Sequence, residues 1–258
     1  MNVGNYHILS SLGSGSYGAV YNGSHMLTKD AVAIKFSLEK DNLAINNEIK
    51  CYLLLKNNPH IPKLKTIGKL NNYRYLVIER LDVSLEKLQT IHNRFSPQQV
   101  YIWGLQLVDC LETMHLKGIV HRDLKPGNIL LNKKQNKLYI CDFGMASLYR
   151  TSKQKHIKKY NVQIGSTRYM SINSHNMINP VRKDDLESIG YILWELLEGT
   201  LPWKNKNKNK SKKLKLITKP ISTELELFIN HCKNLNYDEH PNYLLLKAYL
   251  KRLTPNNT

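Results

Sequence analysis

The chain has 258 residues, 41% of them hydrophobic, which is enough for one large domain or two modest lobes around a shared core. Its four cysteines form no Cys-x-x-Cys pair, which argues against a structural zinc site or a disulfide framework and favours a reducing compartment. The formal net charge of +18 indicates an anionic partner such as nucleic acid, a membrane surface or an acidic protein.

The N-terminal residues show no basic stretch followed by an apolar run, so we expect no signal peptide. The most apolar stretch, residues 188–199, is too short for a membrane span and contains two glutamates. We therefore expect an intracellular protein, cytoplasmic or nuclear, with no membrane segment, and nothing indicates an obligate dimer, so we expect a monomer. The richness in lysine, asparagine and isoleucine is typical of an AT-rich genome, such as that of a large virus or a protist.

The first 78 residues have mainly the pattern of β-strands. Two strands flank a glycine-rich turn, a β-branched apolar strand follows, and Asn71-Asn72 indicates a hairpin turn between two more. These five predicted strands are residues 6–13, 19–25, 31–36, 65–70 and 73–80. A single helix is expected within residues 41–58, ended by Pro59.

After residue 83 the pattern becomes helical. The first long helix is expected within residues 95–118, with Ser96 as N-cap, Pro97 at the first helical position and Gly118 at its end. The apolar residues that fall on one face of this helix are Val100, Trp103, Leu107, Leu111 and Met114. Three further helices are expected over residues 184–199, ended by Gly199, and over 222–235 and 243–253. The sequence therefore predicts an α+β fold, with a small β-rich lobe followed by a larger, mainly helical lobe.

Three glycines at residues 13, 15 and 18 form a Gly-x-Gly-x-x-Gly pattern. Glycines at this spacing leave the backbone amides open to a phosphate group. Many such matches are only turns, but here the pattern lies between two predicted strands, whereas in a dinucleotide-binding fold it opens a helix. Lys35 ends the apolar strand that follows, and Glu48 on the next helix offers it a carboxylate partner. Such a pair would hold the lysine ready for the α- and β-phosphates of a nucleotide.

The stretch HRDLKPGN, residues 121–128, contains the charges that phosphoryl transfer needs. Asp123 could accept the proton of an attacking hydroxyl, and Lys125 could neutralise charge on the transferred group. Asn128 offers an amide oxygen to Mg²⁺, and Asp142 in CDFG, after the strand-like KLYI, offers a carboxylate. Each motif alone could be a surface feature, whereas their joint occurrence in this order indicates a catalytic site.

With these motifs the chain resembles the eukaryotic protein kinase family over essentially its whole length. The resemblance implies a single bilobal kinase domain over residues 1–258, with the N-lobe at 1–78, the hinge at 79–82 and the C-lobe at 83–258. It also implies ATP and Mg²⁺, and the lysine at position 125 is similar to the serine/threonine branch. By this resemblance, Asp185 would anchor the catalytic loop, Ile78 would be the gatekeeper, and the residues that line the nucleotide site would be Leu12, Gly13, Gly15, Gly18, Val20, Ala33, Lys35, Glu48, Ile78, Glu79 and Leu81.

The segment after DFG is similar to that of the casein kinase I group. GSTRYMSIN is followed by RKDDLESIGY and LPW, and SIN (171–173) stands where most kinases have Ala-Pro-Glu. Members of that group favour acidic or already phosphorylated protein substrates. The resemblance therefore implies phosphate recognition by Arg168, Arg182 and Lys183, although the latter two could instead pair with Asp184 and Asp185 as a structural cluster.

Two other functions remain open on the sequence alone. A pseudokinase that only binds would normally have lost one of Lys35, Asp123, Asn128 or Asp142, and all four are present. The run KNKNKNKSKKLK, residues 204–215, contains seven lysines and is typical of a solvated loop. It could also contact nucleic acid without base specificity, since it has no interleaved aromatic residues.

Overall fold

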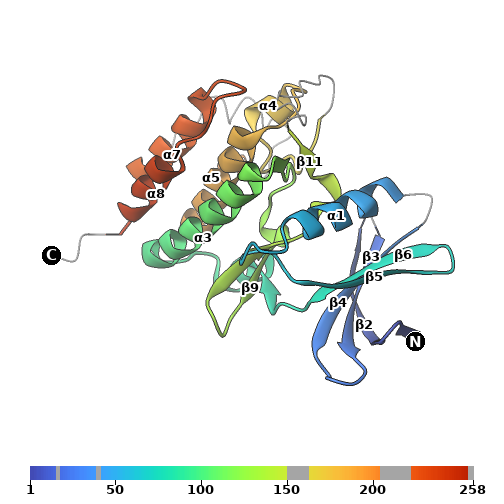
Figure 1. The fold of residues 1–258 in the computed structure, drawn as a ribbon. Coiled ribbons are helices and arrows are strands. Elements are labelled where there is room, and N and C mark those ends of the chain that lie inside the picture. Colours follow the sequence, from blue (N-terminus) through green and yellow to red (C-terminus); the bar gives the residue numbers. More distant parts are fainter. Residues whose placement is uncertain (16–17, 39–41, 150–162, 204–221, 255–258) are drawn as a thin grey trace.

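The computed structural model describes residues 1–15, 18–38, 42–149, 163–203 and 222–254 (Figure 1). A β-rich N-terminal lobe lies beside a larger lobe made mainly of helices, so the predicted α+β, bilobal architecture is confirmed. None of the helices within those ranges is long and apolar enough to cross a membrane.

The N-terminal lobe is built on one antiparallel sheet with the strand order β1-β2-β3-β4-β6-β5. The strands are β1 (Asn2–Val3), β2 (Tyr6–Gly15), β3 (Gly18–His25), β4 (Ala31–Leu38), β5 (Leu64–Leu70) and β6 (Tyr73–Glu79). Asn71 has a positive φ of 51° in the turn between β5 and β6, which confirms the predicted hairpin. Helix α1 (Asn42–Leu54) contacts β4, β5 and β6, and it ends four residues earlier than predicted, well before Pro59.

The alternation of side chains along β4 gives this sheet two different faces. Val32 and Ile34 are fully buried in a small core with Tyr75 and Val77. Ala33 and Lys35 point to the opposite face, which is turned toward α1 and the other lobe. The apolar strand that the sequence predicted therefore buries one face and presents its lysine on the other.

The larger lobe contains helices α2 (Leu85–His92), α3 (Pro97–Leu116), α4 (Ile172–His175), α5 (Arg182–Glu198), α7 (Thr223–Asn234) and α8 (Tyr243–Lys251). Ser96 caps α3 by accepting a hydrogen bond from the Gln99 amide at 3.2 Å, as the sequence predicted. Gly199 ends α5 in the left-handed conformation, with φ of 77°, as expected for a C-terminal glycine.

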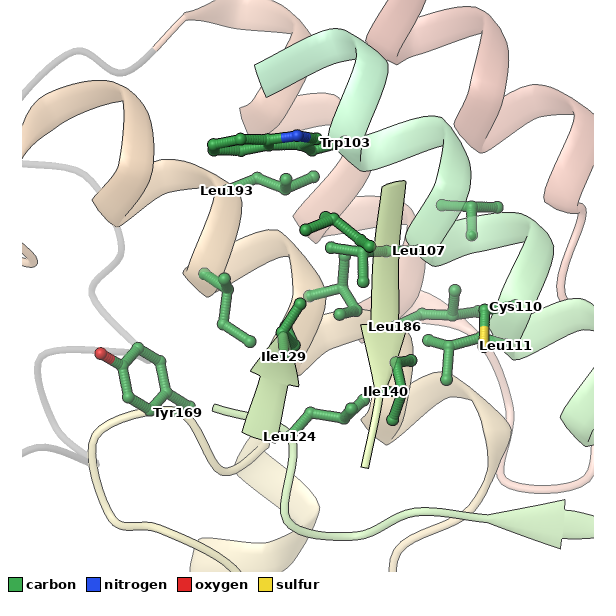
Figure 2. Packing of buried hydrophobic residues seen from close by; sticks show 14 of the residues in the cluster. Trp103, Leu107, Cys110, Leu111, Leu124, Ile129, Ile140, Tyr169, Leu186 and Leu193 are labelled. Carbon is green, nitrogen blue, oxygen red and sulfur yellow. The ribbon is translucent and has the colours of Figure 1, made fainter. Parts of the chain in front are cut away.

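The main core lies between these helices (Figure 2), and its buried residues continue into the smaller lobe at α1 and β6. Trp103, Leu107 and Leu111 form the buried face of α3, on the helical spacing that the sequence predicted. They pack with Leu186 and Leu193 of α5, both fully buried. This core fixes the position of the short strands that carry the polar loops between the lobes.

Two small sheets and two short helical turns support those loops. The first sheet has the order β10-β9-β7, and the second pairs β11 with β8. The strands are β7 (Val83–Ser84), β8 (Ile119–Val120), β9 (Ile129–Asn132), β10 (Lys137–Ile140) and β11 (Ser147–Leu148), and the turns are η2 (Pro126–Asn128) and η3 (Phe143–Met145). The turn η2 ends at Asn128, and η3 begins directly after Asp142. Both turns therefore lie at residues that the sequence predicted for the site.

Candidate active site

A cleft of about 640 Å³ lies between the two lobes and collects most of the predicted site residues. Its lining comprises Leu12, Gly13, Gly18, Val20, Ala33, Lys35, Glu48, Tyr52, Leu76, Ile78, Glu79, Arg80, Leu81, Asp82, Val83, Ser84, Lys87, Asp123, Lys125, Gly127, Asn128, Leu130, Cys141 and Asp142. The volume is in the range of a small-molecule site. The structure therefore brings together residues that are as far as 130 positions apart in the sequence.

The roof of the cleft is the hairpin of β2 and β3. Gly18 has a φ of +128°, and a Cβ there would lie 1.8 Å from the Phe36 carbonyl oxygen, so the backbone itself requires glycine. Gly13 differs, because a Cβ there would meet no protein atom within 4 Å. Its lack of a side chain instead leaves open space in the cleft, as a bound phosphate would need. Gly15 pairs with Gly18 at the tip of the hairpin, and its predicted ligand contact stays a prediction.

The segment that joins the lobes offers a backbone donor to the cleft. Ile78 lies opposite Ala33 in the sheet, and both line the cleft. Leu81 is buried, and within the described ranges no acceptor is hydrogen-bonded to its backbone amide. Buried backbone amides are almost always paired, so this one is suited to a ligand such as the base of a nucleotide.

Lys35 is the centre of the charged group at the back of the cleft. Its Nζ donates to Glu48 Oε2 at 2.6 Å and to Asp142 Oδ1 at 2.7 Å. Burial disfavours the charge on Lys35, but the two carboxylates outweigh this effect and raise the pKa of its ammonium. Burial likewise acts against the charge on Asp142, but Lys35 prevails and the pKa of that carboxyl is lowered. The predicted Lys35–Glu48 pair is confirmed, and the charged carboxylate of Asp142 forms a second ion pair with the same lysine.

The backbone of Asp142 is in the left-handed conformation, with φ of 64° and ψ of 73°, which residues other than glycine rarely adopt. The next residue, Phe143, is fully buried. Its ring packs against Tyr52 at 5.1 Å and against His121 at 5.3 Å between ring centroids. The buried ring keeps the backbone of this segment in place and so directs the Asp142 carboxylate into the cleft.

The loop of residues 121–128, which the sequence predicts to be the catalytic loop, places Asp123 beside two donors. Lys125 Nζ donates to Asp123 Oδ2 at 2.9 Å. The amide nitrogen of Asn128 donates to the Asp123 carbonyl oxygen at 2.9 Å. These contacts arise within one loop because η2 turns the chain back between Lys125 and Ile129. The predicted group of Asp123, Lys125 and Asn128 is thus assembled at the cleft.

Ser166 is a site residue that the sequence pattern did not reveal. Its backbone amide and its hydroxyl both donate to Asp123 Oδ1, at 2.8 and 2.7 Å. With Lys125 on Oδ2, both oxygens of the Asp123 carboxylate are held. Ser166 lies 43 positions after Asp123, so only the fold makes this contact visible. The sequence signal available was a hydroxyl residue directly after Gly165.

Asp185 supports the catalytic loop from inside the larger lobe, as the resemblance implied. Its carboxylate accepts the backbone amides of His121 at 2.7 Å and Arg122 at 2.9 Å. It also accepts a hydrogen bond from His115 Nε2 at 3.1 Å. Burial acts against its charge, but His115, His121 and the backbone donors together lower the pKa of this carboxyl. Arg122 has a positive φ of 70°, so these bonds stabilise an unusual backbone conformation just before Asp123.

The oxygen atoms of Asn128 and Asp142 fit the requirements of Mg²⁺. The Asn128 nitrogen and Asp142 Oδ1 make hydrogen bonds, while Asn128 Oδ1 and Asp142 Oδ2 make none among the described residues. Both are hard oxygen donors, which Mg²⁺ prefers. The described ranges contain no cluster of three His, Cys, Asp or Glu residues that could hold a metal ion. This composition suits Mg²⁺ that takes its other ligands from phosphate groups and water.

Arg168 is placed where it can reach a ligand in solvent. Its side chain is 40% exposed, and its nearest described carboxylate is Glu195, at 3.9 Å from NH1. This distance exceeds that of a charge-assisted hydrogen bond, so the guanidinium is not fully engaged. Tyr169 donates to the same buried Glu195, and Trp203 Nε1 donates to the Arg168 carbonyl at 2.8 Å. These contacts fix the backbone that carries the arginine.

Arg182 and Lys183 do not form part of such a surface, and the phosphate-recognition role expected for them is wrong. Both are buried in the first turn of α5, which begins two residues earlier than predicted. Arg182 NH2 donates to the carbonyl of Asp238 at 2.7 Å, and Lys183 Nζ donates to that of Leu235 at 2.7 Å. Their side chains thus donate hydrogen bonds to backbone carbonyls at the end of α7 and in the loop that follows it.

Tyr52 and Cys141 also line the cleft, where the sequence did not predict them. Tyr52 on α1 places a fully buried hydroxyl at the back of the cleft, and that oxygen has no hydrogen-bond partner among the described residues. Cys141 lines the same region, and burial raises the pKa of its thiol, so it stays protonated.

The lysine run at 204–215 lies outside the described residues, so its contact with nucleic acid stays a prediction.

The family model described as the protein kinase domain matches residues 6–252 of this chain. The match covers both lobes and all the residues that line the cleft.

Proposed function

The chain belongs to the protein kinase family, and from this premise we propose that it is a serine/threonine protein kinase acting on acidic or phosphorylated proteins. It would transfer the γ-phosphoryl group of ATP to a hydroxyl side chain. The observation that carries the proposal is the Asp123 carboxylate, which Lys125 and Ser166 hold in the same cleft as the Lys35–Glu48–Asp142 group.

In this reaction the acceptor oxygen bonds to the γ-phosphorus while the bond from that phosphorus to the bridging oxygen breaks, and ADP leaves. Asp123 accepts the hydroxyl proton, since both its oxygens face donors that keep the carboxylate in one orientation. Lys125, which lies next to that carboxylate, would neutralise charge on the transferred group. Most of the rate enhancement would come from positioning and electrostatic stabilisation, as in phosphoryl transfer generally.

The other polar groups would hold the nucleotide. Lys35 would bind the α- and β-phosphates while Glu48 keeps its ammonium in place. Asn128 and Asp142 would hold Mg²⁺, which when bound neutralises the charge on the β- and γ-phosphates. The Leu81 amide would donate to the base, and the glycine hairpin would cover the phosphates.

A pseudokinase is the alternative from another class of function. A protein of this kind would be expected to lack or displace one of the groups that hold the nucleotide, the metal or the acceptor. The four residues in question, Lys35, Asp123, Asn128 and Asp142, all line one cleft, which favours an active enzyme. Transfer by the wild type that is lost in Asp142→Asn would exclude the pseudokinase.

The substrate class rests on Arg168, the remaining member of the three proposed phosphate-binding residues. We expect transfer to an acidic serine peptide, faster transfer when a phosphoserine stands three residues upstream, and little transfer to the matching tyrosine peptide. The variant Arg168→Ala should lose the preference for the phosphorylated peptide, while Arg252→Ala, which changes an exposed arginine after α8, should keep it. Transfer without any such preference would contradict the proposed substrate class but not the kinase activity.

A further inference from the structure

Asn47 connects the two lobes next to the charged group of the cleft. It precedes Glu48 on α1, and its side-chain nitrogen donates to two backbone carbonyls of the segment after Asp142. The acceptors are the oxygens of Phe143, at 3.2 Å, and Ala146, at 2.5 Å. An asparagine amide has two N–H donors and no charge, so it can satisfy both carbonyls at once.

The segment that Asn47 contacts needs such support. It follows Asp142, whose left-handed backbone conformation is unfavourable for a residue with a side chain. Within the short turn η3 the Ala146 amide donates to the Phe143 carbonyl at 3.0 Å, and the carbonyls of Phe143 and Met145 also accept hydrogen bonds from side chains outside the turn. From the other lobe, Arg122 Nε donates to the Met145 carbonyl at 2.6 Å. The turn is thus held by one side chain from each lobe.

We infer that Asn47 is a positioning residue that fixes the Asp142 carboxylate for the metal by tying residues 143–146 to α1. Lys35 alone does not fix this carboxylate when the nucleotide arrives, because the phosphates compete for the same ammonium. The Asn47 bonds go to backbone and are unaffected by that competition. This inference rests on the proposed function, since it concerns how the same site is kept in the arrangement that transfers phosphate.

The test compares the affinity for MgATP with that for adenosine, each measured by calorimetry on the full chain. Asn47→Ala should weaken MgATP binding roughly thirtyfold, since two hydrogen bonds of about 1 kcal/mol each sum to about 2 kcal/mol, and it should lower kcat by a similar factor. Adenosine binding should change by less than about twofold, because it uses the hinge and not the metal. A general loss of structure would weaken both ligands together, so the contrast between them identifies positioning.

Asn46→Ala is the matched control, because Asn46 lies one residue earlier on α1 and its side chain instead accepts a hydrogen bond from Arg74. It should bind both ligands as the wild type does. Asn47→Asp is the second variant: it keeps the shape but replaces the donors by acceptors, and it should lose at least as much MgATP affinity as Asn47→Ala. Equal losses in Asn46→Ala, or wild-type MgATP affinity in Asn47→Ala or Asn47→Asp, would overturn the inference. Absence of transfer by the wild type would instead count against the proposed function, and the binding comparison would still decide the role of Asn47.

Discussion

The hydroxyl of Tyr243 on α8 donates a hydrogen bond of 2.7 Å to Nδ1 of His115 on α3. The direction of this bond follows from the other side of the imidazole, where Nε2 lies 3.1 Å from Asp185 Oδ2. The charged Asp185 carboxylate cannot donate, so His115 carries its proton on Nε2. Burial lowers the pKa of His115, so the ring is neutral and Nδ1 must accept. A chain of hydrogen bonds thus connects the last helix to the backbone of the catalytic loop.

Tyr243→Phe would leave the buried Nδ1 of His115 without a donor. We expect the free energy of unfolding to fall by about 1–3 kcal/mol, the usual cost of a buried unsatisfied polar group. Urea denaturation would measure it. Tyr249→Phe is the control on the same helix, because its hydroxyl makes no hydrogen bond with the rest of the described chain. Equal stability of both variants would show that the Tyr243 bond contributes little.

Two glycines of the roof should respond differently to the same substitution. Gly18→Ala forces a Cβ against the Phe36 carbonyl at a positive φ, so we expect a loss of roughly 2 kcal/mol or more and a lower Tm. Gly13→Ala meets no protein atom, so its Tm should stay close to that of the wild type. Its MgATP affinity should nevertheless fall about tenfold, because the methyl group enters the space for phosphate. A lowered Tm without loss of affinity in Gly13→Ala would contradict this assignment.

The sequence predicted those elements and residues whose signals are local. Ser96 and Gly199 at helix ends, Asn71 in its hairpin and the apolar spacing of α3 are all decided by near neighbours in the chain. The motif residues were also recognised, because their order and spacing are specific. Contacts between segments that are distant in the sequence could not be predicted from local patterns or motifs.

Three residues show why those contacts were missed. Ser166 gains its role from Asp123, 43 residues away, and Asn47 from Phe143, 96 residues away. Arg182 resembled a surface cation, but α5 begins at this residue and carries it beneath the carbonyls of residues 238 and 239. In each case the partner is backbone or a carboxylate whose position depends on the packing of the whole lobe.

Asp184 should make stability depend on pH. Burial, together with the nearby Glu187, raises the pKa of its carboxyl to about 7. A carboxyl with a raised folded-state pKa favours the folded state below that value and disfavours it above, so this contribution is lost as pH rises from about 4 to 7. Asp184→Asn should match the wild type near pH 4 and be more stable at pH 8, by up to about 4 kcal/mol. Thermal unfolding at both pH values measures the difference, and a less stable variant at pH 8 would contradict it.

Ser166 should contribute to turnover rather than to nucleotide binding. Ser166→Ala removes one of the two bonds that this residue gives to Asp123, so we expect kcat to fall about tenfold, as for a hydrogen bond to a charged group. MgATP affinity should stay unchanged. Ser166→Thr keeps the hydroxyl and should restore most of kcat. Ser147→Ala, in β11, is the control and should have wild-type kcat, because its hydroxyl donates only to the neighbouring Leu148 carbonyl among the described residues.

The central claim is that Asp123, held by Lys125 and Ser166, makes this chain an active kinase. The most direct measurement is transfer of labelled γ-phosphate from ATP to a serine peptide by the wild type and by Asp123→Asn. We expect clear transfer by the wild type and a loss of at least about 10²-fold in kcat for the variant, with MgATP affinity retained. No transfer by folded, MgATP-binding wild type, or equal transfer by Asp123→Asn, would contradict the account.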